Sequence, residues 1–364
     1  MNKSPIKYLN IWLLIISIFV IDVKAEDREI TLGVIADLTG GSASAGLDCK
    51  TGFDVARKIW APNDKRGEYK IKFHYGDTQG ETKNAISEFK KMTESDKVSA
   101  VVITRSQYAM SVNPISKEKK IPILATAAHH EFLKQNPYAF RFIENTTIEG
   151  TNLANKMIAS GHKRIAIVTA EDEFTISLTK EFVIAFNKLG GEVVYQNNVV
   201  GDSPDYQPIV NQMRLQKPDA VFVNVLIPQA ASLFRRIREM GMKQTIYTHY
   251  WCAKDEVVKA ANGTAEGVIF VEINLDRKKF REEYQKLIGE RIPNAPAYCC
   301  YAALALILQT IEQIKQENFN DKFLLALSDQ KQIELLDETI SMVNREAQYE
   351  IVFKTVKQNK IMDL

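Results

Sequence analysis

The sequence is poor in the features that mark several classes of protein. Cysteine occurs four times in 364 residues, too rarely for a small disulfide scaffold. Glycine and proline, at 17 and 11 residues, exclude a collagen-like or linker-dominated chain. Beyond residue 25, acidic and basic residues number 44 each, so no excess of positive charge is present to attract nucleic acid. We therefore expect no nucleic-acid partner.

Motifs of catalysis and metal binding are also absent. The chain has no G-x-S-x-G, no H-E-x-x-H, no C-x-x-C and no G-x-G-x-x-G after a predicted strand. Gly41 and Gly46 have the glycine spacing of a phosphate-binding loop, but Leu47 and Asp48 separate the second glycine from Lys50. We expect no enzyme activity, no cofactor and no metal. An exported hydrolase is the weakest alternative, because no pair of nucleophile and base can be named.

The first 25 residues resemble an export signal. Lys3 and Lys7 precede an apolar run over residues 11–21, and Val23-Lys24-Ala25 forms a small-residue cleavage site. An uncleaved anchor is the alternative, but the apolar run is shorter than the ~20 residues of a membrane span. Cleavage after Ala25 would leave no cysteine at the new N-terminus for a lipid anchor. We expect a soluble, monomeric protein of the periplasm, without a lipid anchor or a second apolar run of this length.

Short β-branched runs alternate with amphipathic stretches along the rest of the chain. This alternation is typical of βαβ units and a mostly parallel sheet. The predicted strands cover residues 30–36, 70–75, 98–103, 121–124, 164–169, 192–197, 220–225, 245–248 and 267–271, with a late strand over 350–356 that is either parallel or antiparallel. The polar, β-rich segment 140–147 suits a crossover between two lobes, and no flexible linker separates them.

The four cysteines, Cys49, Cys252, Cys299 and Cys300, allow one or two disulfides in an oxidising compartment, and their pairing cannot be inferred from sequence. Cys299 and Cys300 fall on a predicted helix, where neighbouring side chains point in directions about 100° apart. We expect one of them to face the core and the other a groove.

Several polar residues follow predicted strands, where α/β proteins place their ligands. Thr39 and Ser42 lie in the glycine-rich loop after the first strand, and could bind a small polar group together with backbone N–H groups. A turn without a ligand is the alternative. His129 and His130 follow the strand over 121–124, and Glu171, Asp172 and Glu173 follow that over 164–169.

The order and spacing of these segments resemble the solute-binding proteins of branched-chain amino-acid ABC transporters, the Leu/Ile/Val-binding, type I periplasmic family. The resemblance extends from about residue 30 to the C-terminus. It rests on residues 30–40 with Gly46 and Gly52, and on 76–79, 114–124, 164–167, 217–222, 265–268 and 298–304.

The resemblance implies an α/β protein of two lobes, each a mostly parallel sheet flanked by helices, with several hinge crossings. The implied boundaries are 1–25 for the signal peptide, 26–144 plus about 273–335 for lobe 1, and 145–272 plus about 336–364 for lobe 2. The implied function is the periplasmic component of an ABC importer that closes on a small carboxylate-bearing ligand, an amino acid or a related acid or amide, and presents it to membrane permease subunits. The alternative is a ligand sensor that docks on a membrane receptor or kinase.

The resemblance also implies ligand-binding residues, all of them between the lobes. Ser106 and Gln107 fall where the family holds the ligand carboxylate, and Ala128 and His129 fall on its next strand-end pair. Phe174, Ile227 and Trp251 fall at or near positions that the family uses in its second lobe. Trp251 falls near the position at which the family has an acid that binds the ligand ammonium. In this chain, Asp172, Glu173 or Asp255 would have to bind the ammonium instead. The aromatic walls suit an aromatic or aliphatic acid, or a cation.

Overall fold

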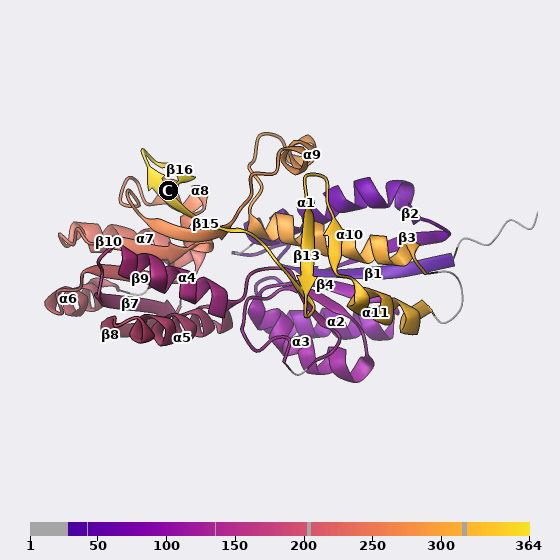
Figure 1. The fold of residues 1–364 in the computed structure, drawn as a ribbon, viewed down its shortest axis with the longest axis horizontal. Coiled ribbons are helices and arrows are strands. Elements are labelled where there is room, and N and C mark those ends of the chain that lie inside the picture. Colours follow the sequence, from indigo (N-terminus) through magenta and orange to yellow (C-terminus); the bar gives the residue numbers. More distant parts are fainter. Residues whose placement is uncertain (1–27, 42, 135, 202–204, 315–318) are drawn as a thin grey trace, which may run out of the picture.

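The computed structural model of the chain describes residues 28–41, 43–134, 136–201, 205–314 and 319–364 (Figure 1). The predicted signal peptide and Ser42 lie outside these residues. The described chain forms two sheets, each flanked by helices, which lie at the right and left of Figure 1. This α/β architecture confirms the predicted fold class.

The first lobe is built on a nine-stranded sheet, as far as the described residues show. Its order is β12-β13-β14-β6-β5-β4-β1-β3-β2, with parallel pairing from β14 through β3 and antiparallel pairing at both edges. The strands are β1 (Arg28–Ala36), β2 (Lys65–Arg66), β3 (Tyr69–Asp77), β4 (Ala100–Thr104), β5 (Ile123–Thr126), β6 (Ala139–Arg141), β12 (Gln332–Glu334), β13 (Thr339–Val343) and β14 (Glu346–Ala347). Its helices are α1 (Ala43–Trp60), α2 (Thr82–Glu94), α3 (Ser106–Lys119), α9 (Lys278–Ile288), α10 (Ala295–Glu312) and α11 (Phe319–Asp329), with a short 3-10 turn, η1 (Pro62–Asp64).

The second lobe has a seven-stranded sheet within the described chain, in the order β16-β15-β11-β10-β9-β7-β8. Its strands are β7 (Arg164–Ala170), β8 (Glu192–Val199), β9 (Ala220–Asn224), β10 (Thr245–His249), β11 (Ile269–Ile273), β15 (Ile351–Lys357) and β16 (Lys360–Asp363). Its helices are α4 (Thr146–Ala159), α5 (Glu173–Lys188), α6 (Gln207–Leu215), α7 (Ile227–Glu239) and α8 (Asp255–Ala260), with the 3-10 turn η2 (Tyr250–Ala253). The late strand β15 pairs antiparallel with β11.

Within its described residues, the chain crosses between the lobes three times. The crossings follow β6, β11 and β14, over residues 142–145, 274–277 and 348–350 (Figure 1). The third crossing corrects the boundary expected near residue 336, because β13 and β14 extend the first sheet and only β15 enters the second. Residues 336–347 therefore belong with the first lobe. Their strands are short and half polar, so the hydrophobic pattern does not reveal them.

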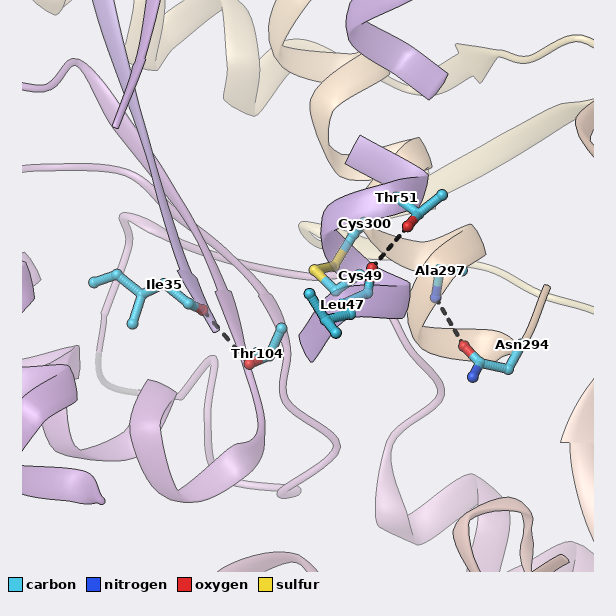
Figure 2. Close-up of a disulfide and its surroundings, with 8 residues drawn as sticks. All are labelled: Ile35, Leu47, Cys49, Thr51, Thr104, Asn294, Ala297 and Cys300. Carbon is cyan, nitrogen blue, oxygen red and sulfur yellow. Dashed lines mark hydrogen bonds between the residues drawn. A yellow bond between two sulfur atoms is a disulfide. The ribbon is translucent and has the colours of Figure 1, made fainter. Parts of the chain in front are cut away.

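The first lobe is held together by the helix pair α1 and α10. A disulfide joins Cys49 of α1 to Cys300 of α10 (Figure 2), while Cys252 and Cys299 are free and buried. Both Cys299 and Cys300 are buried, so the expectation that one would face a groove is wrong. The helices approach closely at Gly52, where an added Cβ would lie 1.8 Å from the carbonyl oxygen of Ala297.

Helix α10 is long and apolar enough, by length and composition, to cross a membrane. In the structure 16 of its 18 residues are buried within the protein. Hydrophobic residues all round a helix are expected where it lies in a core. We interpret α10 as the central core helix of the first lobe.

Candidate functional site

A pocket lies between the lobes, at the carboxyl ends of strands from both sheets. It holds about 500 Å³ of empty space, a volume that includes open solvent at its mouth. It is lined by Arg105, Ser106, Thr126, Ala128, Asp172, Phe174, Leu226, Ile227, Pro228, Tyr250 and Trp251. These residues lie at or just after the ends of β4, β5, β7, β9 and β10, because parallel strands bring their carboxyl ends to one edge of a sheet.

On the side of the first lobe, the turn from β4 into α3 shapes the pocket. Arg105 occupies this turn with φ 62° and ψ 141°, a backbone conformation that is uncommon for any residue except glycine. Such strain costs on the order of 1–3 kcal/mol and is concentrated at functional sites. The turn places Ser106 at the first position of α3, where free backbone N–H groups favour an anion.

The Ser106 hydroxyl accepts a hydrogen bond from the His129 backbone N–H at 3.2 Å. Its own proton remains available for a partner in the pocket, because a hydroxyl both donates and accepts. Ser106 is buried, with 3% of its surface exposed, and it lines the pocket. The arrangement suits a ligand oxygen that accepts from Ser106.

Arg105 carries the positive charge of the pocket wall. Its Nη1 donates to Asp37 Oδ2 at 3.1 Å and to the Tyr108 hydroxyl at 3.2 Å, and its Nη2 lies 3.5 Å from Asp172 Oδ2. Burial alone would lower the pKa of Arg105, but the nearby Tyr108, Asp172 and Asp37 outweigh it and the pKa is raised. The guanidinium is therefore charged, and it links Asp37 of the first lobe to Asp172 of the second.

The second lobe supplies a largely apolar wall. Phe174 lies in the first turn of α5. Its backbone N–H donates to Asp172 Oδ1 at 2.9 Å, so the Asp172 side chain caps this helix. Tyr250 and Trp251 come from η2, and the Lys254 ammonium lies 5.3 Å from the Trp251 ring centroid. The aromatic rings of Phe174, Tyr250 and Trp251 can enclose an apolar group or face a cation.

Two further polar contacts join the lobes beside the pocket. The Ser44 hydroxyl of α1 donates to Glu256 Oε1 of α8 at 3.0 Å, and Lys254 Nζ lies 3.4 Å from Asp48 Oδ2. Together with the pair between Arg105 and Asp172, they hold the lobes against each other around the site.

The structure brings five of the nine predicted residues to the pocket: Ser106, Ala128, Phe174, Ile227 and Trp251. Their part in ligand binding stays a prediction. Three others lie elsewhere, and Ser42 is outside the described residues. Gln107 follows Ser106 in α3 without lining the pocket. Thr39 donates to Asp77 Oδ2 at 2.6 Å, which ties its loop to the end of β3.

His129 does not line the pocket either. Its Nδ1 accepts from the Glu131 N–H at 3.2 Å, and its ring stacks on that of His130 at 4.9 Å. Burial, with the charge of His130, lowers the pKa of His129 to about 4. It is therefore neutral at pH 7 and cannot serve as a cation for a ligand carboxylate.

Arg105, Thr126, Pro228 and Tyr250 line the pocket but were not predicted. Arg105 had one signal in the sequence, a charged residue directly after the apolar strand β4. Its link to Asp172 joins residues 67 positions apart on different lobes, and no local pattern indicates that contact. In the described chain, no group of three or more histidine, cysteine, aspartate or glutamate side chains could hold a metal ion.

Two buried carboxyl groups lie near the first crossing. Glu144 belongs to the crossing and Glu149 to the first turn of α4. All four carboxyl oxygens are buried, and none has a hydrogen-bond partner among the residues that the structure describes. Burial, reinforced by Glu272, raises the pKa of Glu144 to about 7, and burial with the charge of Glu144 raises the pKa of Glu149. The hinge region thus contains two buried carboxyl groups whose raised pKa values favour the protonated, neutral form.

We expect the substitution Glu144→Gln to stabilise the protein at pH 8 and to change little at pH 5. The pKa of Glu144 rises from 4.5 to about 7 on folding, so the folded protein holds this proton more tightly than the unfolded chain. The free energy of unfolding therefore falls as pH rises from about 4.5 to about 7, and it stays lower above pH 7 by on the order of 3 kcal/mol. Glutamine has no ionised form, so the variant does not lose this stability. Urea unfolding at both pH values measures it. The exposed Glu68→Gln is the control, and equal gains at both pH values would contradict the prediction.

Comparison with known proteins places this architecture among binding proteins. A family model described as periplasmic binding protein matches residues 29–355. The Leu/Ile/Val-binding protein homolog 3 of Brucella melitensis is 23% identical over 334 residues, which cover 87% of this chain and 88% of that protein. The match therefore extends over both lobes.

Two solved structures share the fold. The branched-chain amino acid transporter substrate binding protein of Streptococcus pneumoniae, in complex with isoleucine, has a TM-score of 0.83 and 19% identity, covering 92% of this chain and 98% of that one. A solute binding protein of an ABC transporter from Rhodopseudomonas palustris, in complex with 3,4-dihydroxy benzoic acid, has a TM-score of 0.82 and 21% identity, covering 93% and 96%. With a family model that spans residues 29–355 and this shared fold, the chain belongs to the periplasmic binding protein family, as the resemblance in its sequence indicated.

Proposed function

We propose that the protein is the solute-binding component of an ABC importer in the periplasm. It captures a small carboxylate-bearing molecule between its lobes, closes by a hinge motion and presents the closed form to membrane permease subunits. The observation that carries this proposal is a pocket built from strand ends of both lobes, which three crossings connect within the described residues. A ligand that contacts both walls stabilises the closed form over the open one.

The first lobe offers the position for the carboxylate. The N-terminus of α3 provides backbone N–H groups and the positive end of the helix dipole, and the Ser106 hydroxyl adds a donor. Among the described residues, the Ser106 hydroxyl contacts a backbone N–H and no base that could activate it as a nucleophile. This contact supports recognition of a ligand over turnover.

The proposal is tested by thermal unfolding of the purified protein with amino acids, aromatic acids, short amides and polyamines. A ligand at a hundred times its dissociation constant stabilises the folded state by about 2.7 kcal/mol. For a chain of this size that is a rise of about 4 °C in the unfolding midpoint. One responsive chemical class is the expected result. No response to any compound would contradict the proposal.

For the responsive ligand, Ser106→Ala is expected to weaken binding by about 1–3 kcal/mol, or roughly 5- to 150-fold, because the carboxylate loses a hydroxyl donor in a buried site. Isothermal titration calorimetry measures the dissociation constant. The exposed Ser95→Ala at the end of α2 is the matched control. An unchanged dissociation constant in Ser106→Ala would remove Ser106 from the site.

A further inference from the structure

A buried pair of opposite charges joins the lobes outside the pocket. The Lys254 ammonium, between η2 and α8 of the second lobe, lies 3.4 Å from Asp48 Oδ2 in α1 of the first lobe. The Lys254 side chain is 10% exposed and that of Asp48 is 1% exposed, so both charges are largely removed from water. Neither residue lines the pocket, but the Lys254 ammonium lies 5.3 Å from the ring centroid of Trp251, which does. The pair therefore depends on how the lobes meet and not on contact with a ligand.

Asp48 has further partners that come from its own lobe. Its Oδ1 accepts from the Tyr284 hydroxyl at 3.1 Å and lies 2.9 Å from Arg291 Nη2, and its Oδ2 accepts from the Asn294 side-chain amide. Tyr284 belongs to α9, Asn294 immediately precedes α10, and Arg291 lies between these helices, all in the first lobe. Asp48 therefore keeps three partners when the lobes move apart, and its charge stays compensated in both forms.

Lys254 has no comparable set of partners in its own lobe. Among the described residues its ammonium has one hydrogen-bond acceptor, Asp48. Burial lowers the pKa of Lys254, and the attraction of Asp48 and Glu256 raises it by less, while Arg291 adds to the lowering. The Lys254 ammonium is therefore less favourable here than in water, even with Asp48 beside it. Without Asp48, closing the lobes would bury an ammonium that has no counter-ion.

We propose that Asp48 and Lys254 are positioning residues that control closure, because the lobes close only in the register that brings the Lys254 ammonium to Asp48. Removing one partner of a buried pair costs much more than replacing the pair by apolar groups, so a closure that misses Asp48 is strongly disfavoured. The Trp251 ring lies next to Lys254, and the same register therefore places this part of the pocket wall. The inference rests on the hinge motion of the proposed function, and it assigns neither residue a contact with the ligand.

The test measures closure without a ligand. The Ser44 hydroxyl and Glu256 Oε1 lie 3.0 Å apart across the lobes, so Ser44→Cys with Glu256→Cys places two thiols near each other when the lobes are closed. A short bis-maleimide crosslinker then traps each molecule that visits this form, and mass spectrometry follows the crosslinked fraction with time. Cys252 and Cys299 are buried, which protects them from the reagent. The doubly substituted protein is the reference.

In this reference, Asp48→Asn should slow crosslinking about 10-fold or more, because asparagine has no charge to compensate the buried Lys254 ammonium. Adding Lys254→Met should restore the rate to within about 3-fold of the reference, since the unpaired cation is then gone. A defect confined to the first lobe would not be repaired by this change in the second. Lys254→Met alone should also crosslink within about 3-fold of the reference, because Asp48 keeps its partners in the first lobe.

Lys254→Glu keeps the test decisive if Asp48→Asn does not fold, because it leaves the first lobe unchanged. It places two carboxylates against each other on closure and should also slow crosslinking about 10-fold or more. The matched control is Lys259→Met combined with Asp48→Asn, since Lys259 is an exposed lysine of α8 and its loss should not restore the rate.

The inference would be overturned if Asp48→Asn or Lys254→Glu crosslinked as fast as the reference, or if Lys254→Met alone were as slow as Lys254→Glu. Equal restoration by Lys254→Met and Lys259→Met would overturn it too, as would a reference protein that does not crosslink. The ligand panel tests the proposed function separately, because crosslinking uses no ligand.

Discussion

Replacing Arg141 by methionine is expected to lower the free energy of unfolding by about 3–5 kcal/mol, the range for breaking a buried ion pair. Arg141 ends β6 immediately before the first crossing, and its side chain is 2% exposed. Methionine fills a similar volume but donates no hydrogen bond. Urea unfolding of the variant, monitored by circular dichroism, measures the loss.

The size of this effect follows from the three acceptors of Arg141, one of them buried and two partly buried. Its Nε and Nη2 donate to the carbonyls of Ala127 and His129 at 2.9 and 2.7 Å, and its Nη1 lies 3.1 Å from Glu346 Oε1. Removal of the donor leaves these groups without their partner, which costs more than the bond itself contributed. Because Ala128 lies between the two carbonyls and borders the pocket, we expect ligand affinity to fall as well.

The control for this prediction is Arg164→Met. Arg164 makes a 2.6 Å ion pair with Glu192, but its side chain is 47% exposed, and surface pairs contribute about 0–1 kcal/mol. If Arg141→Met lost no more stability than Arg164→Met, the buried network around Arg141 would not have the importance assigned to it.

The second large effect is expected from the disulfide between Cys49 and Cys300. These residues are 251 positions apart, and crosslinking a loop of that length restricts the unfolded chain strongly. We expect the double substitution Cys49→Ala, Cys300→Ala to cost about 4 kcal/mol, which for this chain lowers the unfolding midpoint by roughly 5 °C. Thermal unfolding followed by circular dichroism measures this shift.

Reduction of the wild-type protein provides an independent form of the same experiment. Dithiothreitol should lower the midpoint of the wild type toward that of the double variant and leave the double variant unchanged. Cys252 and Cys299 are present in both proteins, so any effect of the reductant on the free thiols cancels. A wild-type midpoint that does not respond to complete reduction would contradict the prediction.

The parts of the fold that could be predicted from sequence are those with a strong local pattern. The central strands are continuous apolar runs, such as Ala100–Thr104, in which every residue is buried. In β12, β13 and β14 only alternate positions are buried, and two of these strands have three residues or fewer. Their place in the first sheet depends on pairing with β6, residues 139–141, about 200 positions away.

In the site, too, some residues could be predicted from a local pattern and others depend on contacts between distant segments. Residues directly after apolar strands, such as Ser106 and Ala128, could be placed at the pocket because a parallel sheet brings its strand ends together. Thr39 also follows a strand, but its hydroxyl is used by Asp77 within the same lobe. The charge balance of Arg105, Asp37 and Asp172 depends on three segments from two lobes. The sequence contains these residues but not the distances that define their roles.

The three crossings also determine when each lobe can be completed during synthesis. The first lobe needs α10 and β12–β14, which follow residue 294, and the second needs β15 and β16, which follow residue 350. One hydrophobic cluster is complete within residues 35–139, but the cluster that contains α10 draws on residues from 30 to 347 and needs the end of the chain. Domains made of one continuous segment, by contrast, commonly fold in order from the N-terminus. Maturation of both lobes is therefore concentrated in the last fifth of the chain, and the same interleaving that lets the lobes hinge makes their folding interdependent.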